Sequence, residues 1–376
     1  MTNDPADSSG VDLQERFDGF GNGYRMNCNC GRATNLSAAM YVERETIDAL
    51  IPCDHCDRTI HFGPAVAAIR DEHDPALDNA VVPRLAWYHT STSPDWPSAT
   101  YAAQVESQMK EATVRLAYPF ERFVEPEITK ALHVGTYEAA IENMLRRMHD
   151  QADATSQFYL HRVTLDLDPS RINDGYRDEN HEPASHLSIS DLEAAGLDAV
   201  RYLNVHEAVG SLSLAVHPRA LRTVQTLALP VADVAGPIPP PLAGQLAELD
   251  AERQELASAA TAWAHVDSWQ LRRKQLGLSA DPDGLGQRSQ EVEQRTWQLW
   301  DRVNELLEEH YLPGVSLVIR RDFSDALRDW RADSGTDSVT GFADVYAASA
   351  IVMTQAREVV RLVSERTPRQ VISALS

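Results

Sequence analysis

The chain has 376 residues, which predicts two or three domains, and 56 acidic against 34 basic side chains give it a formal net charge of −22. That charge repels phosphates and anionic membranes over about 8–10 Å, so nonspecific nucleic-acid binding is disfavoured. A hydrophobic content of 43% without any run of 18 apolar residues is typical of a globular protein that has no transmembrane helix and no membrane partner.

The first segments along the chain are a lead-in over residues 1–24, expected to be disordered, and a small metal-binding unit over 25–64. The lead-in is acidic and Gly-rich and lacks the basic and apolar parts of a signal peptide, so we expect a cytoplasmic protein. Two close cysteine pairs supply the four thiolates of a structural zinc ion, and the spacing therefore predicts a zinc ribbon. The metal ligands would be the only cysteines of the chain: Cys28, Cys30, Cys53 and Cys56.

Other interpretations of the cysteines remain open. A disulfide within the Cys-x-Cys pair is disfavoured because one intervening residue strains the bridge. A redox-active Cys-x-x-Cys motif would be followed by a helix, whereas residues 57–63 have a strand-like pattern. Because the Cys-x-Cys spacing is shorter than usual, His55 or His61 could replace a thiolate. Four thiolates leave no open position on the metal, so a catalytic zinc is not expected.

Residues 84–230 mix strand and helix patterns and predict an α+β domain. Apolar or alternating runs predict strands at 84–89, 131–134, 158–167, 199–205 and 211–216. Apolar residues at helical spacing predict helices at 98–116 and 137–148. The polar stretch 168–186 has the composition of a loop.

The segment 231–244 contains a Gly-Pro-Ile-Pro-Pro-Pro run, a stiff linker that marks the best domain boundary. Residues 245–376 predict a helical domain, with helices over 242–263, 289–310 and 341–365. The expected fold class is α+β, with an N-terminal zinc ribbon, a mixed middle domain and a C-terminal helical bundle. Packing in that bundle explains an apolar stripe at spacings of three and four: Trp297, Trp300, Val303, Leu306 and Leu307.

Three motifs of the middle domain carry candidate functional residues, and each is a strand that ends in polar side chains. They are Trp87-Tyr88-His89-Thr90-Ser91, Leu132-His133-Val134-Gly135-Thr136-Tyr137-Glu138-Ala139-Ala140, and Tyr202-Leu203-Asn204-Val205-His206-Glu207. In this order the motifs resemble the ADP-ribosyltransferase superfamily, whose members split NAD⁺ and transfer its ADP-ribose. The resemblance is closest to the compact rifamycin-modifying enzymes.

The resemblance implies an ADP-ribosyltransferase-like fold over residues 84–230, NAD as substrate, and transfer of ADP-ribose to an unidentified acceptor. It makes His89 and Glu207 the catalytic candidates: His89 would hold the ribose, and Glu207 would orient its 2′-hydroxyl and stabilise the positive charge that develops on the sugar. Further contacts to NAD would come from Thr90, Thr136 and Tyr137, with Tyr137 or Tyr118 stacking on the nicotinamide.

The chain also departs from the family pattern, because Thr90 stands where the family has a glycine and the second strand has no matching tyrosine. Each candidate has a structural interpretation as well: His89 as a core-edge histidine, Thr136 as a helix N-cap, Glu207 as a turn carboxylate. Signatures of P-loop, dinucleotide-binding, serine-hydrolase and His-Glu-x-x-His sites are absent from the sequence. The alternative function is a non-enzymatic interaction or assembly protein of phage or mobile-element origin, with an unknown protein partner.

Overall fold

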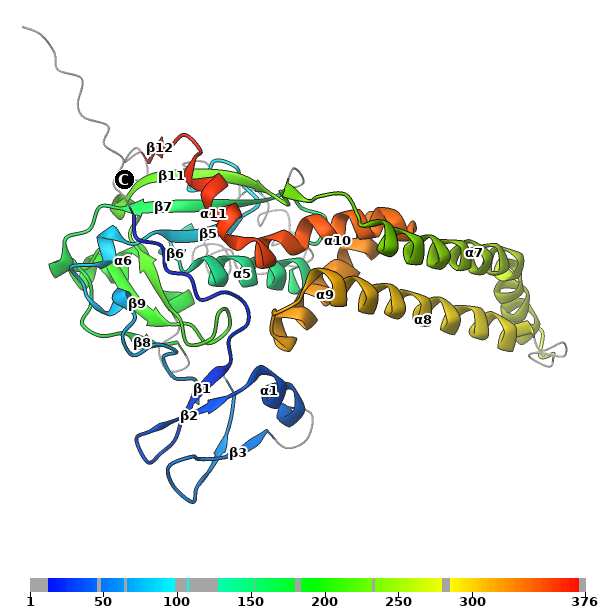
Figure 1. Cartoon of the computed structure of the whole chain (residues 1–376), viewed down its shortest axis with the longest axis horizontal. Coiled ribbons are helices and arrows are strands. Elements are labelled where there is room, and N and C mark those ends of the chain that lie inside the picture. The colour runs from blue at the N-terminus through cyan, green and yellow to red at the C-terminus, as the bar shows by residue number, and fades with distance from the viewer. Residues whose placement is uncertain are drawn as a thin grey trace, which may run out of the picture.

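The computed structural model describes residues 13–45, 49–63, 66–98, 107, 128–151, 153–179, 184–231, 234–278 and 285–371. Within these ranges the protein has the mixed α+β composition that the sequence predicts (Figure 1). Apart from residues 98 and 107, the helix predicted over 98–116 lies outside the described ranges, as does Tyr118. None of the described helices combines the length and apolar character needed to cross a bilayer.

The four-cysteine segment, residues 24–63, contains two β-hairpins and one helix (Figure 1). Its buried side chains are few, and α1 also contacts the C-terminal helix α9. A segment with so small a core needs another source of stability, such as a bound metal ion. Its elements are β1 (Tyr24–Asn27), paired antiparallel with β2 (Ala33–Leu36), then α1 (Ala38–Glu45), and β3 (Leu50–Pro52), paired antiparallel with β4 (Thr59–His61).

The middle of the chain forms two four-stranded sheets. The first has the order β12-β11-β7-β5 and the second the order β6-β10-β9-β8, with all pairs antiparallel except β8 with β9. Five of these strands were predicted from apolar or alternating runs, whereas β11 was not, nor were the two-residue strands β8, in the predicted loop, and β12, in the predicted helical domain. The strands are β5 (Trp87–Ser91), β6 (Leu132–Val134), β7 (Phe158–Leu165), β8 (Arg177–Asp178), β9 (Ala199–Leu203), β10 (Leu212–Val216), β11 (Leu221–Leu229) and β12 (Arg369–Gln370).

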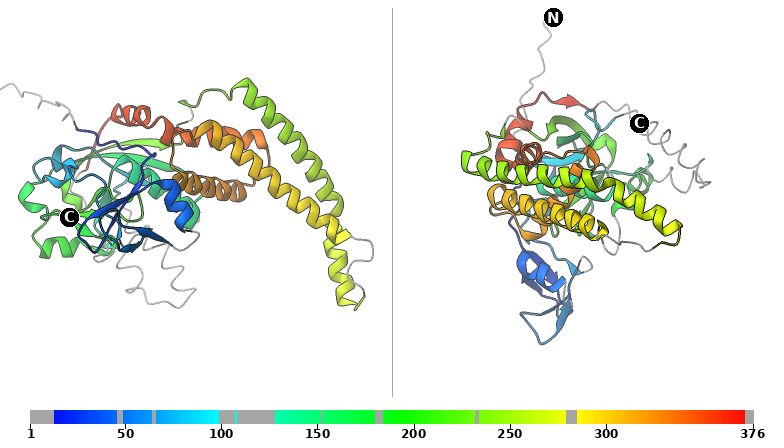
Figure 2. Two further views of the ribbon diagram at one scale, coloured as in Figure 1. Left: turned by 60° about the horizontal axis from the view of Figure 1, so that its bottom comes forward. Right: turned by 90° about the vertical axis from the view of Figure 1, so that its right-hand side faces the viewer.

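Helices cover the first sheet and extend away from it. α5 contacts β5 and α9, α11 contacts β7 and β11, and α7 packs along α8. The α7–α8 hairpin projects from the body of the molecule, as Figure 1 and the left view of Figure 2 show. The helices are α5 (Tyr137–Asp150), α6 (Ile189–Ala194), α7 (Pro240–Gln275), α8 (Leu285–Tyr311), α9 (Leu317–Ser334), α10 (Val339–Thr354) and α11 (Ala356–Ser364); single 3-10 turns lie at Pro75–Leu77, Val82–Arg84, Pro169–Arg171, Ala184–His186 and Pro218–Ala220.

One continuous core joins the first sheet to the C-terminal helices. It contains Tyr137 of α5, Leu229 of β11 and Phe342 of α10. The segment predicted as a linker does not interrupt this core, because Val231 and Leu242 are both buried in it. The burial of apolar side chains is therefore shared between the predicted middle and C-terminal domains.

Residues 13–20, which the sequence placed in the lead-in, pack against the body of the protein. Leu13 and Phe20 are buried in the large core. The backbone of Gln14 bonds to the carbonyl of Arg84 and to the amide of Ala86, each at 2.8–2.9 Å. Apolar side chains and backbone pairing hold this stretch in place, so the expectation of a disordered lead-in does not extend to it.

Candidate functional site

The four cysteines come together at the tips of the two hairpins. Their Sγ atoms lie within 4.8 Å of one another, and in the described part of the chain they are the one group of three or more Cys, His, Asp or Glu side chains close enough to hold a metal ion. The first turn is closed by a bond from the Cys28 amide to the Arg32 carbonyl, and the second by one from the Cys53 amide to the Arg58 carbonyl, both 2.9 Å. The donor set and its spacing fit one thiophilic metal ion.

His55 lies beside the cluster, but its ring does not point at a sulfur. Its Nε2 is 3.0 Å from the Ala33 carbonyl, while its amide donates to the Sγ of Cys53 at 3.4 Å. That amide bond is the main cause that lowers the pKa of Cys53 to about 6, in favour of the thiolate that binds metals. The pKa of Cys28 is raised instead: a backbone bond from Cys30 lowers it, but desolvation and hydrogen bonds among the thiols outweigh that effect.

The two sheets meet at one backbone pair between β5 and β6. Tyr88 and Gly135 exchange two N–H···O bonds of 2.9 Å, and the ladder does not continue beyond them. A Cβ on Gly135 would lie 2.5 Å from the Oγ of Ser213, so the backbone pair with Tyr88 requires a glycine at this position. His89 and His133 lie beyond this pair, on the same side of it, where the two strands belong to different sheets.

The imidazole of His89 is packed against aromatic rings. It stacks on Trp96 with ring centroids 4.1 Å apart and lies 6.2 Å from the ring of His161. Burial, followed by the neighbouring rings of His161 and His133, lowers the pKa of His89 well below its usual value, and a hydrogen bond with the His133 backbone opposes this shift. A neutral imidazole results at pH 7, as a group that orients a hydroxyl requires.

His133 presents the clearest unused hydrogen-bonding atom in this region. Its Nδ1 lies 3.1 Å from the hydroxyl of Tyr202, whereas its Nε2 is buried and has no partner among the described residues. Burial lowers the pKa of His133 to about 4 and raises that of Tyr202 well above its usual value. Buried polar atoms are normally paired, so the free nitrogen of this neutral ring is suited to a ligand.

Two carboxylates complete the cluster. The Oε1 of Glu207, in the loop after β9, accepts bonds from the Arg146 guanidinium at 2.5–2.7 Å and from Asn143 Nδ2 at 3.3 Å. Glu179 follows β8; burial, followed by the charge of Glu207, raises its pKa to about 7, and its Oε2 has no partner among the described residues. After burial, the charges of both carboxylates also raise the pKa of Tyr202, so this tyrosine lies within electrostatic reach of both.

The two predicted catalytic residues are thus connected indirectly. No hydrogen bond joins His89 to Glu207 in the described part of the chain. His133 contributes to the low pKa of His89, Glu207 contributes to the high pKa of Tyr202, and a hydrogen bond joins His133 to Tyr202. We name the five residues that make this connection the split cluster, since they lie where the sheets separate: His89, His133, Glu179, Tyr202 and Glu207.

The other predicted NAD-binding residues have structural partners. The Oγ1 of Thr90 donates to the Ala140 carbonyl at 2.6 Å, and that of Thr136 accepts from the Ala139 amide as the N-cap of α5. Tyr137 is fully buried, and its hydroxyl donates to the Val352 carbonyl at 2.7 Å. These partners leave Tyr137 no free face on which a nicotinamide ring could stack.

Sequence reasoning did not single out Glu179, Asn143 or Arg146 as functional. Glu179 lies in the polar stretch whose composition predicts only a loop. Asn143 and Arg146 are three positions apart on the predicted helix, a spacing that places both on one face, so their common orientation was detectable. Their shared partner on a distant loop was not.

Comparison of this chain with family models, with curated proteins and with solved structures gives no match. The split cluster and the four-cysteine segment therefore have to be interpreted from their own chemistry.

Proposed function

We propose that this protein transfers ADP-ribose from NAD⁺ to an acceptor at the split cluster. The observation that carries the proposal is the buried Nε2 of His133, which has no partner among the described residues and lies in a polar cluster with buried Tyr202, half-buried His89 and two half-buried carboxylates. Neutral imidazoles and a carboxylate are the groups needed to hold ribose hydroxyls around a developing positive charge.

In the proposed reaction the bond from the ribose C1′ to the nicotinamide nitrogen breaks, and nicotinamide leaves with the bonding electrons. Glu207, held by Arg146 and Asn143, would accept a hydrogen bond from the 2′-hydroxyl of the ribose and stabilise the positive charge of the oxocarbenium-like sugar. A lone pair of the acceptor then forms the new bond to C1′. Glu179, whose pKa is near 7, is suited to take the proton that the acceptor loses.

The four cysteines would hold a structural zinc ion. Support comes from an all-sulfur donor set, which zinc prefers, and from the small core of the segment that carries it. Four protein ligands fill the tetrahedron, so the metal would stabilise the segment and take no part in the transfer.

The test of the transferase is nicotinamide release from NAD⁺ by the wild type, by Glu207→Ala and by Glu193→Ala. Loss of a charge-stabilising group typically costs about 10²–10³-fold in rate, which is the decrease expected for Glu207→Ala. Glu193 lies on α6 and pairs with His217, so its variant should release nicotinamide as the wild type does. Background release from the wild type, or equal release from all three proteins, would refute the proposal.

The alternative, a non-enzymatic interaction protein, is favoured by one observation. The α7–α8 hairpin projects from the body (Figure 2) and carries exposed apolar side chains. Leu276 is 67% exposed, and Trp297, which was expected to pack in the bundle with Trp300, is 60% exposed, so that expectation was wrong for Trp297. Exposed apolar residues on a projecting element are typical of a protein-binding surface. Absence of nicotinamide release by the wild-type protein would favour this alternative function.

A further inference from the structure

The chain leaves the four-cysteine segment through a short extended strip, residues 66–70, before it enters the middle domain. On one side this strip is paired with β1. The Ala68 amide donates to the Arg25 carbonyl at 2.8 Å, and Met26 forms an antiparallel bridge with Ala67. The side chains of Arg25 and Asn27 add bonds to the carbonyls of the strip at 3.2–3.3 Å. The strip is thus fixed to the strand that leads directly into Cys28.

The other side of the strip contacts the loop that carries Glu207, residues 204–211. The Arg70 amide donates to the Gly210 carbonyl at 2.8 Å, and the Arg70 guanidinium donates to the Val209 carbonyl at 2.9 Å. A Cβ on Gly210 would lie 2.7 Å from the Ala68 carbonyl oxygen. Strip and loop are therefore in direct backbone contact, with no room for a side chain at that point.

This loop depends on its neighbours for its conformation. Ala208 has a φ of +44°, which is unfavourable for a residue with a Cβ. Its amide is held by the Oε2 of Glu142 at 2.6 Å, and the adjacent Glu207 by Arg146. Such a conformation persists when surrounding contacts over-determine it, and here those contacts are α5 on one side and the strip on the other.

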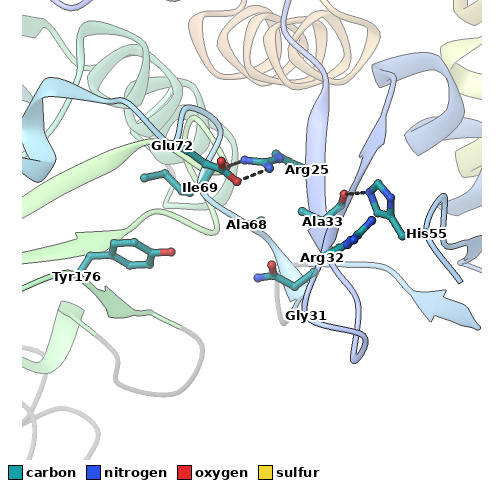
Figure 3. A pocket seen from close by; sticks show the side chains of 10 residues that line it. Arg25, Gly31, Arg32, Ala33, His55, Ala68, Ile69, Glu72 and Tyr176 are labelled. Carbon is teal, nitrogen blue, oxygen red and sulfur yellow. Dashed lines mark hydrogen bonds and ion pairs between the residues drawn. The ribbon is translucent and has the colours of Figure 1, made fainter.

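The strip is largely buried: Ala67, Ala68 and Ile69 are all buried, and it borders a groove on one side. Ala68 and Ile69 line a groove of about 380 Å³ between the four-cysteine segment and the half-exposed ring of Tyr176 (Figure 3). The packing of Ile69 in the core beneath it, together with the bonds to β1 and to the loop, fixes the position of the strip. A displacement of β1 would consequently be transmitted to the loop.

We infer that Arg70 is a positioning residue through which the four-cysteine segment sets the conformation of the Glu207 loop, so that removal of the cysteine-bound metal loosens this loop. The catalytic consequence of this coupling rests on the proposed function. The coupling itself does not, because it is a property of the fold.

Hydrogen–deuterium exchange of the full-length protein tests the coupling, and it requires no turnover. After removal of the metal with a chelator, we expect the loop peptide 204–211 to exchange at least about fivefold faster, the factor for loss of one net hydrogen bond. Peptides of α10 should keep their exchange rate. A loop that is unaffected when the four-cysteine segment itself exchanges faster would overturn the inference, as would a protein whose cysteines bind no metal.

Variants of Arg70 separate coupling from general destabilisation. In Arg70→Ala the loop should exchange at least about fivefold faster although the metal is retained, and chelation should then add little. Arg70→Lys keeps a cation beside Asp18, its partner at 3.4 Å, and should restore part of the protection. Arg219→Ala removes an arginine that pairs with Asp198 elsewhere and should behave as the wild type.

Two outcomes of this series contradict the inference: a loop that chelation accelerates as strongly in Arg70→Ala as in the wild type, or one that Arg70→Ala leaves unchanged. If chelation also speeds hydrogen exchange in α10, the metal-loaded proteins Arg70→Ala and Arg70→Lys are compared instead. In that comparison only the exchange rate of the loop peptide should differ. A failure of nicotinamide release would leave all of these outcomes as they are.

Discussion

At the scale of single residues, the helix α5 carries an unusual carboxylate. Glu142 is half-buried on the side of α5 that faces the Glu207 loop, where it accepts a hydrogen bond from the amide of Ala208. Burial raises its pKa from 4.5 to about 8, against the lowering effect of that amide bond and of Arg70. The folded protein therefore binds a proton here that the unfolded chain releases near pH 4.5.

This difference predicts the sign of a pH dependence. Between about pH 4.5 and 8 the folded state binds the extra proton, so stability is greatest at low pH in this window and decreases as the pH rises. The contribution of Glu142 is at most about 1.4 kcal/mol per pH unit. Glu142→Gln keeps a hydrogen-bond acceptor for the Ala208 amide but cannot ionise. This variant should therefore make the free energy of unfolding less dependent on pH.

Urea unfolding of both proteins at pH 5, 6.5 and 8 measures this effect. The free energy of unfolding of Glu142→Gln should exceed that of the wild type most at pH 8 and least at pH 5. A difference that stays constant over the three pH values would contradict a raised pKa for Glu142. Glu193→Gln, at a half-exposed carboxylate on α6, is the matched control and should leave the slope unchanged.

At the scale of elements, the four-cysteine segment has few buried side chains to stabilise two hairpins and a helix. A metal ion held by four thiolates contributes folding free energy directly, because the unfolded segment has no preformed site. The segment should therefore lose its structure without metal, while the sheets, which have their own core, remain folded.

Metal analysis of the purified protein should find one zinc ion per chain. Cys53→Ser should lower the bound zinc to well below half an equivalent, whereas His55→Ala and His61→Ala should retain it, since neither ring belongs to the group of four sulfurs. Retention of zinc by Cys53→Ser, together with its loss from a histidine variant, would show that a histidine is the fourth ligand.

At the scale of the whole molecule, one core spans the first sheet and the C-terminal helices. Tyr137 of α5 is an anchor of this core: its ring packs edge-on against Tyr88 at 5.6 Å, and its hydroxyl donates to the Val352 carbonyl of α10. The two parts should consequently unfold in a single transition, because neither can expose its face of the core without the other.

Tyr137→Phe should lower the free energy of unfolding by about 1–2 kcal/mol, the cost of losing one buried hydrogen bond. Circular dichroism and tryptophan fluorescence should report the same shifted midpoint. Tyr311→Phe is the control, since its buried hydroxyl has no partner in the described ranges and its loss should cost less than about 0.5 kcal/mol. Two separate transitions, only one of them moved by Tyr137→Phe, would contradict a shared core.

Several elements could be predicted because their signals are local. The alternation in residues 158–167 agrees with β7, and the Gly-Thr before residue 137 agrees with the start of α5, whose N-cap is Thr136. β11 was missed, as was α9; the buried positions of β11 do not alternate strictly, since Leu221, Val224, Leu227 and Leu229 are three, three and two residues apart. Of the candidate site, the sequence indicated His89 and Glu207 by resemblance but not Glu179, whose proximity to Glu207 arises from the packing of β8 on β9.

By itself, the sequence determined the grouping of four cysteines and the mixed α+β composition, because close spacing and periodic burial are encoded over a few residues. Only the tertiary structure decided which polar groups share one environment. Tyr202 bonds to His133 and lies within electrostatic reach of two carboxylates, and Arg70 contacts a loop about 140 positions away, because the sheets and the strip bring these segments together. Such contacts depend on the packing of whole elements, for which a linear pattern of residues carries no signal.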